Sequence, residues 1–261
     1  MDRSVGIVVP AYRPDAAALG AYVRTLDERL APDAIRVELD APRRGTVADL
    51  SALPATVSTS PVRRGKGAAI TAGFEALDTD VLAFADADGS TPPDSVADVL
   101  APVRAGDADL SVGSRRHPAA RVAAHQTFAR RHLGDCFARL GRLLLDAELY
   151  DYQCGAKALA RETWNRVREH LYEPGFAWDV ELVAVAAALD ARLVEVPVTW
   201  EDQPGSTVSP IRASIRLGRG LLTARHRAKL LRQDGLHAAL DARRGTRSSL
   251  IDRLAGEAVD E

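Results

Sequence analysis

Short apolar runs alternate with helical patterns through the first half of this chain. The runs are VGIVV (5–9), IRVEL (35–39), VLAFA (81–85) and ADLSVG (108–113). Helical periodicity lies between them, over 17–30, over 66–77 and from Pro92 onward. Such alternation is typical of βαβ units, whose strands are parallel. The sequence therefore predicts an α/β fold built on a mainly parallel central sheet.

The second half departs from strict alternation. It predicts a helix over about 126–145, a CGAKAL segment, a helix over 180–189 and a strand over 193–198. A further helix over 211–232 carries seven basic residues and no acidic one. Because 261 residues suit one large domain, we expect a single catalytic domain, over 1–210, with two shorter segments after it. These segments are a basic amphipathic helix over 211–234 and a polar, weakly ordered tail over 235–261.

Composition limits the compartment and the class of partner. The formal net charge is −2, which gives no general attraction to nucleic acid. Two cysteines are too few for a disulfide framework, and the N-terminus has no signal-peptide pattern, so we expect a reducing cytoplasm. No run approaches the ~18 to 20 apolar residues that cross a bilayer. Membrane contact is therefore expected to be peripheral, through the cations of 211–232 on an anionic surface, and a solvated helix face is the alternative for these cations.

Two carboxylates, Asp86 and Asp88, directly follow the apolar strand over 81–85. Thr91 before two prolines predicts a helix N-cap, which leaves the carboxylates in a loop at the carboxyl end of the strand. Such a pair can hold Mg²⁺ or Mn²⁺ while leaving positions open for phosphate oxygens. The alternative is an acidic turn that caps the next helix.

Two other segments carry groups suited to a charged ligand. The stretch over 63–67, RRGKG, opens a helix, where basic side chains and free N–H groups suit an anion, and a solvated basic turn is the alternative. Asp179 and Glu181 lie beside Phe176 and Trp178, an arrangement that suits a general base and a sugar platform. Otherwise the two aromatics anchor the core and the two carboxylates cap a helix.

Seven segments occur in the order found in the inverting family-2 glycosyltransferases of GT-A fold. The segments are IVVPAYRPD (7–15), RRGKGAAITAGFEAL (63–77), FADADGSTPPDSV (84–96), VGSRR (112–116), DYQCGAKAL (151–159), FAWDVELV (176–183) and EVPVTWEDQPGSTV (195–208). Within that family the chain most resembles the dolichyl-phosphate glucose and mannose synthases. The later segments look more like the glucosyl branch, which implies a UDP-glucose-like donor.

The resemblance implies roles for individual residues. Pro10, Tyr12, Asp40 and Lys66 would surround the nucleotide, and Asp86 and Asp88 would hold the metal and the diphosphate. Arg115 and either Arg130 or Arg131 would meet the acceptor phosphate. The sugar and acceptor side would be formed by Asp151, Gln153, Lys157, Asp179, Glu181, Trp200 and Ser206. The chain departs from the family where Asp40-Ala41-Pro42 replaces an Asp-Asp-Gly-Ser stretch, a change that bears on base preference.

The expected activity is transfer of a hexose, with inversion, from a nucleotide diphosphate sugar to a polyprenyl or dolichyl phosphate. We expect Asp88, Asp179 and Glu181 to be catalytic. A hydroxyl acceptor is the alternative, and it would need Asp179 as a general base. A sugar-1-phosphate nucleotidyltransferase is disfavoured because Pro10-Ala11-Tyr12 replaces a glycine-rich loop after the first strand. A non-catalytic sugar-nucleotide sensor is disfavoured because both Asp86 and Asp88 are present.

Overall fold

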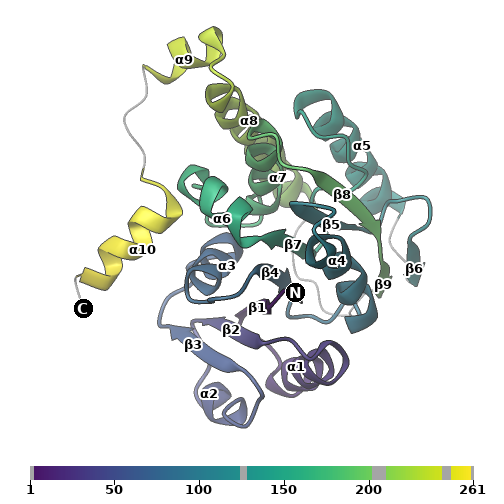
Figure 1. Cartoon of the computed structure of the whole chain (residues 1–261), viewed down its shortest axis with the longest axis vertical. Helices are drawn as coiled ribbons and strands as arrows, with labels where there is room; N and C mark the ends of the chain where they lie inside the picture. The colour runs from purple at the N-terminus through teal and green to yellow at the C-terminus, as the bar shows by residue number, and fades with distance from the viewer. Residues whose placement is uncertain (1–2, 124–127, 202–209, 243–247, 260–261) are drawn as a thin grey trace.

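The computed structural model describes residues 3–123, 128–201, 210–242 and 248–259 of the chain (Figure 1). Within them, seven strands form a sheet in the order β3-β2-β1-β4-β7-β5-β8, in which β7 alone pairs antiparallel to its neighbours. A short parallel pair, β6 and β9, lies outside this sheet. The strands are β1 (Val5–Tyr12), β2 (Ala34–Asp40), β3 (Thr56–Ser60), β4 (Val81–Ala85), β5 (Leu110–Ser114), β6 (Arg121–Ala123), β7 (Ala156–Ala160), β8 (Leu193–Pro197) and β9 (Thr199–Glu201).

Helices connect most of these strands and continue beyond the last one. They are α1 (Ala16–Leu30), α2 (Thr46–Asp49), α3 (Lys66–Glu75), α4 (Pro93–Ala105), α5 (Phe128–Leu144), α6 (Arg161–Val167), the 3₁₀ helix η1 (Arg168–His170), α7 (Trp178–Ala188), α8 (Pro210–Leu231), α9 (Gly235–Asp241) and α10 (Leu250–Val259). None of the helices described is long and apolar enough to cross a bilayer. The predicted mainly parallel α/β fold is confirmed.

The sheet is buried on both faces, and successive residues of a strand enter different cores. In β1, Ile7 and Val9 pack with the apolar faces of α1 and α4, whereas Val8 faces α3 and α7. β4 repeats the pattern, with Ala83 on the first face and Phe84 on the second. This period of two, with helices on both sides, explains why the strands read as continuous apolar runs (Figure 1).

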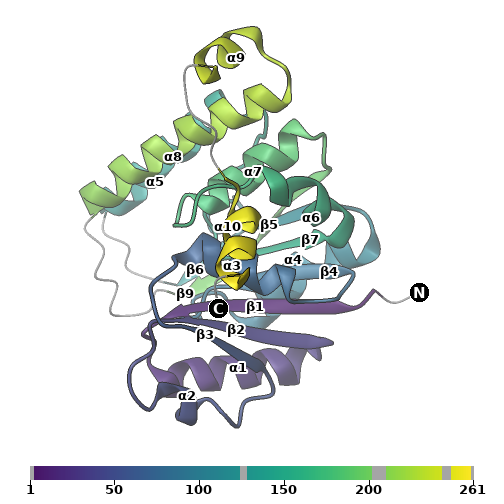
Figure 2. The same ribbon diagram turned by 90° about the vertical axis from the view of Figure 1, so that its left-hand side faces the viewer.

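Helix α7 is buried along its whole length, because α8 covers the side that the sheet leaves open (Figure 2). The sequence of α7 is accordingly apolar all round except for Asp179 and Glu181, which are 2% and 1% exposed. Helix α8 is therefore part of the core of the folded chain.

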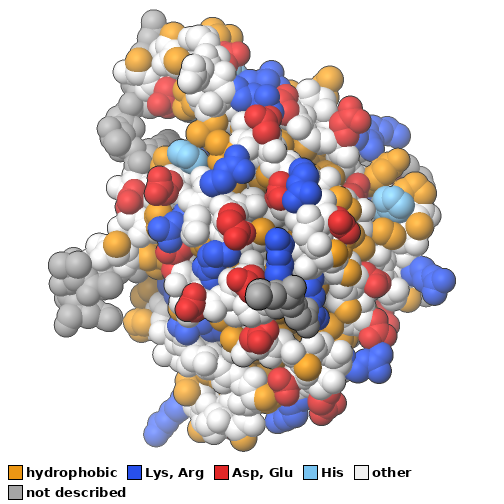
Figure 3. Space-filling model, viewed as in Figure 1, with side chains coloured by type: hydrophobic (Ala, Val, Ile, Leu, Met, Phe, Trp, Pro, Cys, Tyr) orange, Lys and Arg blue, Asp and Glu red, His pale blue; other side chains and the backbone are white. Residues whose placement is uncertain are grey.

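Several of the basic residues over 211–232, which the sequence predicts to face an anionic membrane surface, are paired within the protein. Arg227 pairs with Glu181, Lys229 and Arg232 pair with Asp146, and Arg225 donates to the carbonyl of Leu144. Arg219 is exposed, and the side chains of the two remaining cations, Arg212 and Arg216, lie outside the described part. On the face shown in Figure 3, acidic and basic side chains are intermixed.

Two expectations are wrong. Pro92, and not Thr91, is the N-cap of α4, because a residue before proline is forced into extended backbone and Pro93 follows it. The segment after Asp234 is not a weakly ordered tail, since it contains α9 and α10. Leu250 of α10 is 2% exposed and joins the core cluster under α3 and α7.

The edge strand β3 was not predicted. Its sequence, TVSTS, is polar, and it pairs with β2 alone, so one of its sides stays exposed. An apolar run is the signal of a buried strand, and an edge strand need not carry one.

Candidate active site

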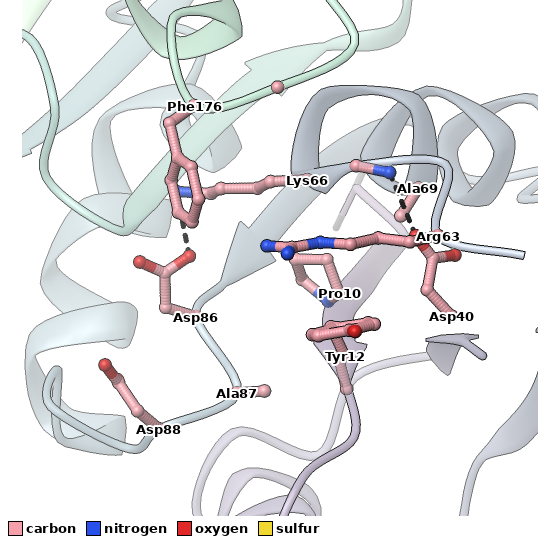
Figure 4. A pocket seen from close by; sticks show the side chains of 13 residues that line it. Pro10, Tyr12, Asp40, Arg63, Lys66, Ala69, Asp86, Ala87, Asp88 and Phe176 are labelled. Atoms are coloured by element: carbon pink, nitrogen blue, oxygen red, sulfur yellow. Dashed lines mark hydrogen bonds and ion pairs between the residues drawn. The ribbon is translucent and has the colours of Figure 1, made fainter. Parts of the chain in front are cut away.

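The carboxyl ends of β1, β2 and β4 meet at one edge of the sheet, where they open into a pocket of about 460 Å³ (Figure 4). Tyr12 at the end of β1 is in register with Asp40 at the end of β2. This edge is where parallel α/β sheets bind ligands. The polar and aromatic side chains of the lining are those of Tyr12, Asp40, Arg63, Lys66, Asp86, Asp88 and Phe176. With Pro10, all six residues expected around the nucleotide, metal and diphosphate line this pocket.

One end of the pocket is built by the loop before α3. Asp40 is 3% exposed, and its two carboxylate oxygens accept from Arg64 Nε at 2.8 Å and from the Gly65 amide at 3.0 Å. Arg63, which precedes Arg64 in this loop, places its guanidinium 4.1 Å from the centre of the Tyr12 ring. Asp40 thus fixes the loop, and Arg63 and Tyr12 form a flat cationic and aromatic surface at this end.

Four alternating charges run from the core into the pocket. Lys157 contacts Asp179 at 2.7 Å, Asp179 contacts Lys66 at 2.9 Å, and Lys66 contacts Asp86 at 2.9 Å. The side-chain exposure rises along this series from 0% at Lys157 to 34% at Asp86. Two ammonium groups and two carboxylates balance, so the buried series carries no net charge.

These contacts fix the ionisation of Lys66, which lines the pocket, and of Asp179 behind it. Burial alone would raise the pKa of Asp179, but Lys157 and Lys66 hold it below its usual range. Burial alone would lower the pKa of Lys66, but Asp179 and Asp86 together raise it. At neutral pH the pocket therefore presents a charged ammonium, and Asp179 is an anion with both oxygens already occupied.

Asp86 and Asp88 enter the pocket from the loop after β4, as the sequence predicts. The amide of Asp86 donates to the carbonyl of Gly155 at 2.8 Å. A Cβ on Gly155 would lie 2.1 Å from Asp86 Oδ2, so only glycine leaves room for this carboxylate. Asp88 is exposed and accepts from the Ser90 amide at 2.9 Å, which orients its carboxylate. In the described part of the chain no third histidine, cysteine or acidic residue completes a metal cage here.

Arg115 and Asp151 form an ion pair in which Asp151 is buried and Arg115 is 24% exposed, and the charge of Asp86 also acts on Arg115. Arg115 Nε and Nη2 lie 2.7 and 3.0 Å from the two oxygens of Asp151, and its backbone amide donates to the same carboxylate at 3.2 Å. Although burial opposes ionisation, Arg115 lowers the pKa of Asp151 to about 2. The guanidinium carbon of Arg115 is 5.7 Å from the Trp200 ring centre. Gln153, whose backbone N–H donates to Asp151, is half-buried in the same loop.

Glu181 lies apart from this pocket. One of its oxygens accepts from the amides of Tyr172 and Glu173, at 2.9 and 2.8 Å, and the carboxylate pairs with Arg227 of α8. Glu181 therefore holds the loop before α7 in place through the backbone of Tyr172 and Glu173. Arg130 and Arg131 lie on α5 with side chains outside the described part, and Ser206 is outside the described residues altogether.

Sequence reasoning missed Gly155 and the carboxylate partners of Arg64, and it left open whether Phe176 lines a site or anchors the core. Of the two aromatics beside Asp179, Trp178 is fully buried in the core, whereas Phe176 is 45% exposed and lines the pocket. A glycine beside Cys154 and a second arginine before Gly65 were visible in the sequence, but the partners that explain them are distant along the chain.

Comparison with known proteins finds glycosyltransferases among the relatives of this chain. Over 160 residues, 61% of the chain, it is 32% identical to glycosyltransferase AglD of Haloferax volcanii. Over 164 residues, 60% of the chain, it is 34% identical to the dolichyl-phosphate beta-glucosyltransferase of Drosophila melanogaster. These alignments span only 25% and 50% of the respective relatives.

A solved structure shares the fold. Glucosyl-3-phosphoglycerate synthase from Mycobacterium tuberculosis, in complex with Mn²⁺, UDP-glucose and phosphoglyceric acid, superposes with a TM-score of 0.65. The match covers 85% of this chain and 80% of that one at 18% identity. The model of the family "Glycosyl transferase family 2" matches residues 6–164, more than half of the sequence. The chain therefore belongs to glycosyl transferase family 2.

Proposed function

We propose that this protein transfers a hexose, with inversion, from a nucleotide diphosphate sugar to a polyprenyl or dolichyl phosphate. The donor favoured by the sequence is UDP-glucose. Family membership and the dolichyl-phosphate beta-glucosyltransferase among the relatives support the reaction and the class of acceptor. The pocket at the carboxyl edge supports the donor, because it places a cation and two carboxylates beside an aromatic surface.

The occupation of Asp179 is the observation that carries the choice of acceptor. A hydroxyl acceptor needs a general base, and Asp179 was the residue expected to serve as one. Both of its oxygens instead bind lysine ammonium groups, and its pKa is lowered, so it is a poor proton acceptor. A phosphate monoester has a second pKa near 6 and is largely a dianion at neutral pH. Such an acceptor can attack the anomeric carbon without a base.

The residues of the pocket divide the donor between them. We assign the base of the nucleotide to the surface formed by Tyr12 and Arg63, which can stack on a planar ring. Lys66 lies at the start of α3, where its ammonium and the helix dipole both favour the diphosphate. Attack from the side opposite the leaving diphosphate inverts the anomeric centre.

The donor set at Asp86 and Asp88 fits a divalent metal ion that binds together with the nucleotide. Two carboxylates one residue apart, without a third protein ligand in the described part, leave positions open for diphosphate oxygens. Bound there, Mg²⁺ or Mn²⁺ would neutralise the charge of the departing diphosphate. Asp88 is the more exposed of the two and is oriented by the Ser90 amide, while Asp86 is tied to Lys66.

We place the sugar and acceptor at the end of the pocket nearest the Arg115–Asp151 pair. Trp200 and Gln153 are close to this pair, and Arg115 supplies a fixed positive charge. In this assignment Asp151 positions Arg115 for the acceptor phosphate. Lys157 and Asp179 act through Lys66, since neither reaches the pocket surface.

Because a polyprenyl phosphate resides in a membrane, we also propose reversible contact with an anionic bilayer. Leu140 and Leu143 of α5 and Leu222 of α8 are exposed, and Arg219 of α8 is exposed as well. Binding to anionic vesicles should weaken as salt rises, because salt screens the arginine contribution. Flotation of the protein with anionic and neutral vesicles measures this. Equal binding to both would contradict an electrostatic contact.

The donor and the metal site are tested together by mass spectrometry of the lipid product. The purified protein is incubated with Mn²⁺, a polyprenyl phosphate and a panel of UDP- and GDP-sugars. Asp88→Ala should lower the rate by about 100-fold or more, the scale of a lost charge-stabilising group. Asp98→Ala, which changes an exposed carboxylate on α4, is the matched control and should keep the rate. Undiminished turnover in Asp88→Ala would remove Asp88 from the proposed site.

A further inference from the structure

The segment over 171–177, between η1 and α7, forms one wall of the pocket and is held by contacts on two sides. Two of its residues, Gly175 and Phe176, line the pocket. On the pocket side, the carbonyl of Pro174 accepts from the Ala68 amide of α3 at 3.1 Å. A Cβ on Gly65 would lie 2.4 Å from the Pro174 oxygen, so the loop and the start of α3 are in close backbone contact.

On its other side the same segment rests on Glu181 and on α8. The amides of Tyr172 and Glu173 both donate to Glu181, which is 1% exposed. Arg227 pairs with Glu181 and places its guanidinium 4.4 Å from the centre of the Tyr172 ring. A buried carboxylate with a cation partner is a firm anchor, because moving away from it would strand a charge.

Helix α10 contacts the segment from the C-terminal end of the chain. In both views α10 lies beside α3 (Figures 1 and 2). The Leu250 amide donates to the carbonyl of Leu171 at 2.8 Å, and Arg253 Nη2 donates to the carbonyl of Tyr172 at 2.5 Å.

The start of α10 is fixed by a reciprocal cap. The amide and hydroxyl of Ser249 both donate to Asp252, and the Asp252 amide donates back to the Ser249 hydroxyl. Since Leu250 is also buried, the position from which Arg253 reaches Tyr172 is set by the fold.

We propose that α10 positions the segment over 171–177, and that Arg253 is a positioning residue for donor binding. The inference rests on the proposed function for its donor, and on the contacts just described for its geometry. Arg253 acts through the Tyr172 carbonyl on the loop that carries Phe176 into the pocket and supports the start of α3, where Lys66 stands.

This arrangement affects donor affinity more than the chemical step. Asp86 and Asp88 follow β4, where the Asp86 amide donates to Gly155 and the Asp88 carboxylate accepts from the Ser90 amide, so neither carboxylate is positioned through α10. Loosening the segment therefore raises the KM of the nucleotide sugar and leaves kcat almost unchanged.

The experiment compares the wild type with Arg253→Ala, Arg253→Lys and the control Arg24→Ala, which changes an exposed arginine on α1, on the opposite face of the sheet. Hydrogen–deuterium exchange of the peptide containing Tyr172 and Glu173 reports on the segment without any substrate. Calorimetry with UDP and steady-state kinetics report on the donor. Thermal melting confirms that each variant is folded.

Arg253→Ala should exchange faster in this peptide and raise the donor KM and the Kd of UDP about five-fold, the scale of one lost hydrogen bond. Arg253→Lys should recover part of both, because an ammonium can donate to the same carbonyl. Unchanged exchange in Arg253→Ala, or the same changes in Arg24→Ala, would overturn the positioning role. If Arg253→Ala exchanges faster but the wild type binds no nucleotide, the contact between Arg253 and the segment is upheld. The proposed function and the role of Arg253 in donor binding are then overturned.

Discussion

At the scale of single residues, the pocket is organised by carboxylates that are satisfied within the protein. Asp40, Asp151 and Asp179 are each almost fully buried, and each is held by arginine or lysine. Their common task is to hold cations in place. Asp86 and Asp88 differ from these three because they are exposed enough to bind the proposed divalent metal ion.

The stability that Asp151 contributes to the folded protein depends on pH. Its pKa in the folded protein is about 2, below the ordinary 3.8, so its pairing with Arg115 stabilises the fold above pH 4. That contribution, roughly 2 kcal/mol at 1.36 kcal/mol per pKa unit, is lost as the pH falls from about 4 to 2. Asp151→Asn should therefore be clearly less stable than the wild type at pH 6, and the difference should narrow towards pH 2.5.

Urea unfolding at several pH values measures that difference. The control is Asp135→Asn, which removes the carboxylate paired with Arg116. Because Asp135 is 43% exposed and Asp151 only 3%, the loss of stability in the control should be much smaller. A gap between wild type and Asp151→Asn that stays constant from pH 6 to 2.5 would contradict the assignment.

At the scale of elements, α8 has one face towards α7 and one towards open space. Two glycines of this helix, two residues apart, lie on different faces: Gly220 on the packed face and Gly218 on the open one. A Cβ on Gly220 would lie 2.3 Å from Ala177 Cβ, whereas one on Gly218 meets no described atom within 4 Å.

Gly218→Ala should raise the free energy of unfolding by about 0.5–1 kcal/mol, because alanine is the better helix former. Gly220→Ala should lower it by about 1–3 kcal/mol, the range for overpacking. Urea unfolding of the two variants provides the comparison. Stabilisation by both substitutions would mean that α8 does not pack closely on the loop before α7.

At the scale of the whole molecule, the sequence predicts what depends on local pattern and misses what depends on distant partners. The strand over 81–85 and the carboxylates after it are found at the predicted positions, because a continuous apolar run and a following turn are local signals. Asp179 is 113 positions from Lys66, and no spacing rule links them.

The pairing of Asp179 therefore could not be read from the sequence, where it looked like a free carboxylate beside aromatics. The same holds for the C-terminal helices. Their polar composition suggested a tail, and only the contact of Leu250 with the core reveals why α10 is folded onto the domain.

We propose that this protein glycosylates a phosphate that is already ionised, since both oxygens of Asp179 are occupied by lysine ammonium groups. The most direct test offers the enzyme, with Mn²⁺ and UDP-glucose, a polyprenyl phosphate and the polyprenol of the same chain length. We predict a glycosyl phosphoryl lipid from the phosphate and no product from the alcohol. Glycosylation of the polyprenol with none of the phosphate would contradict the account.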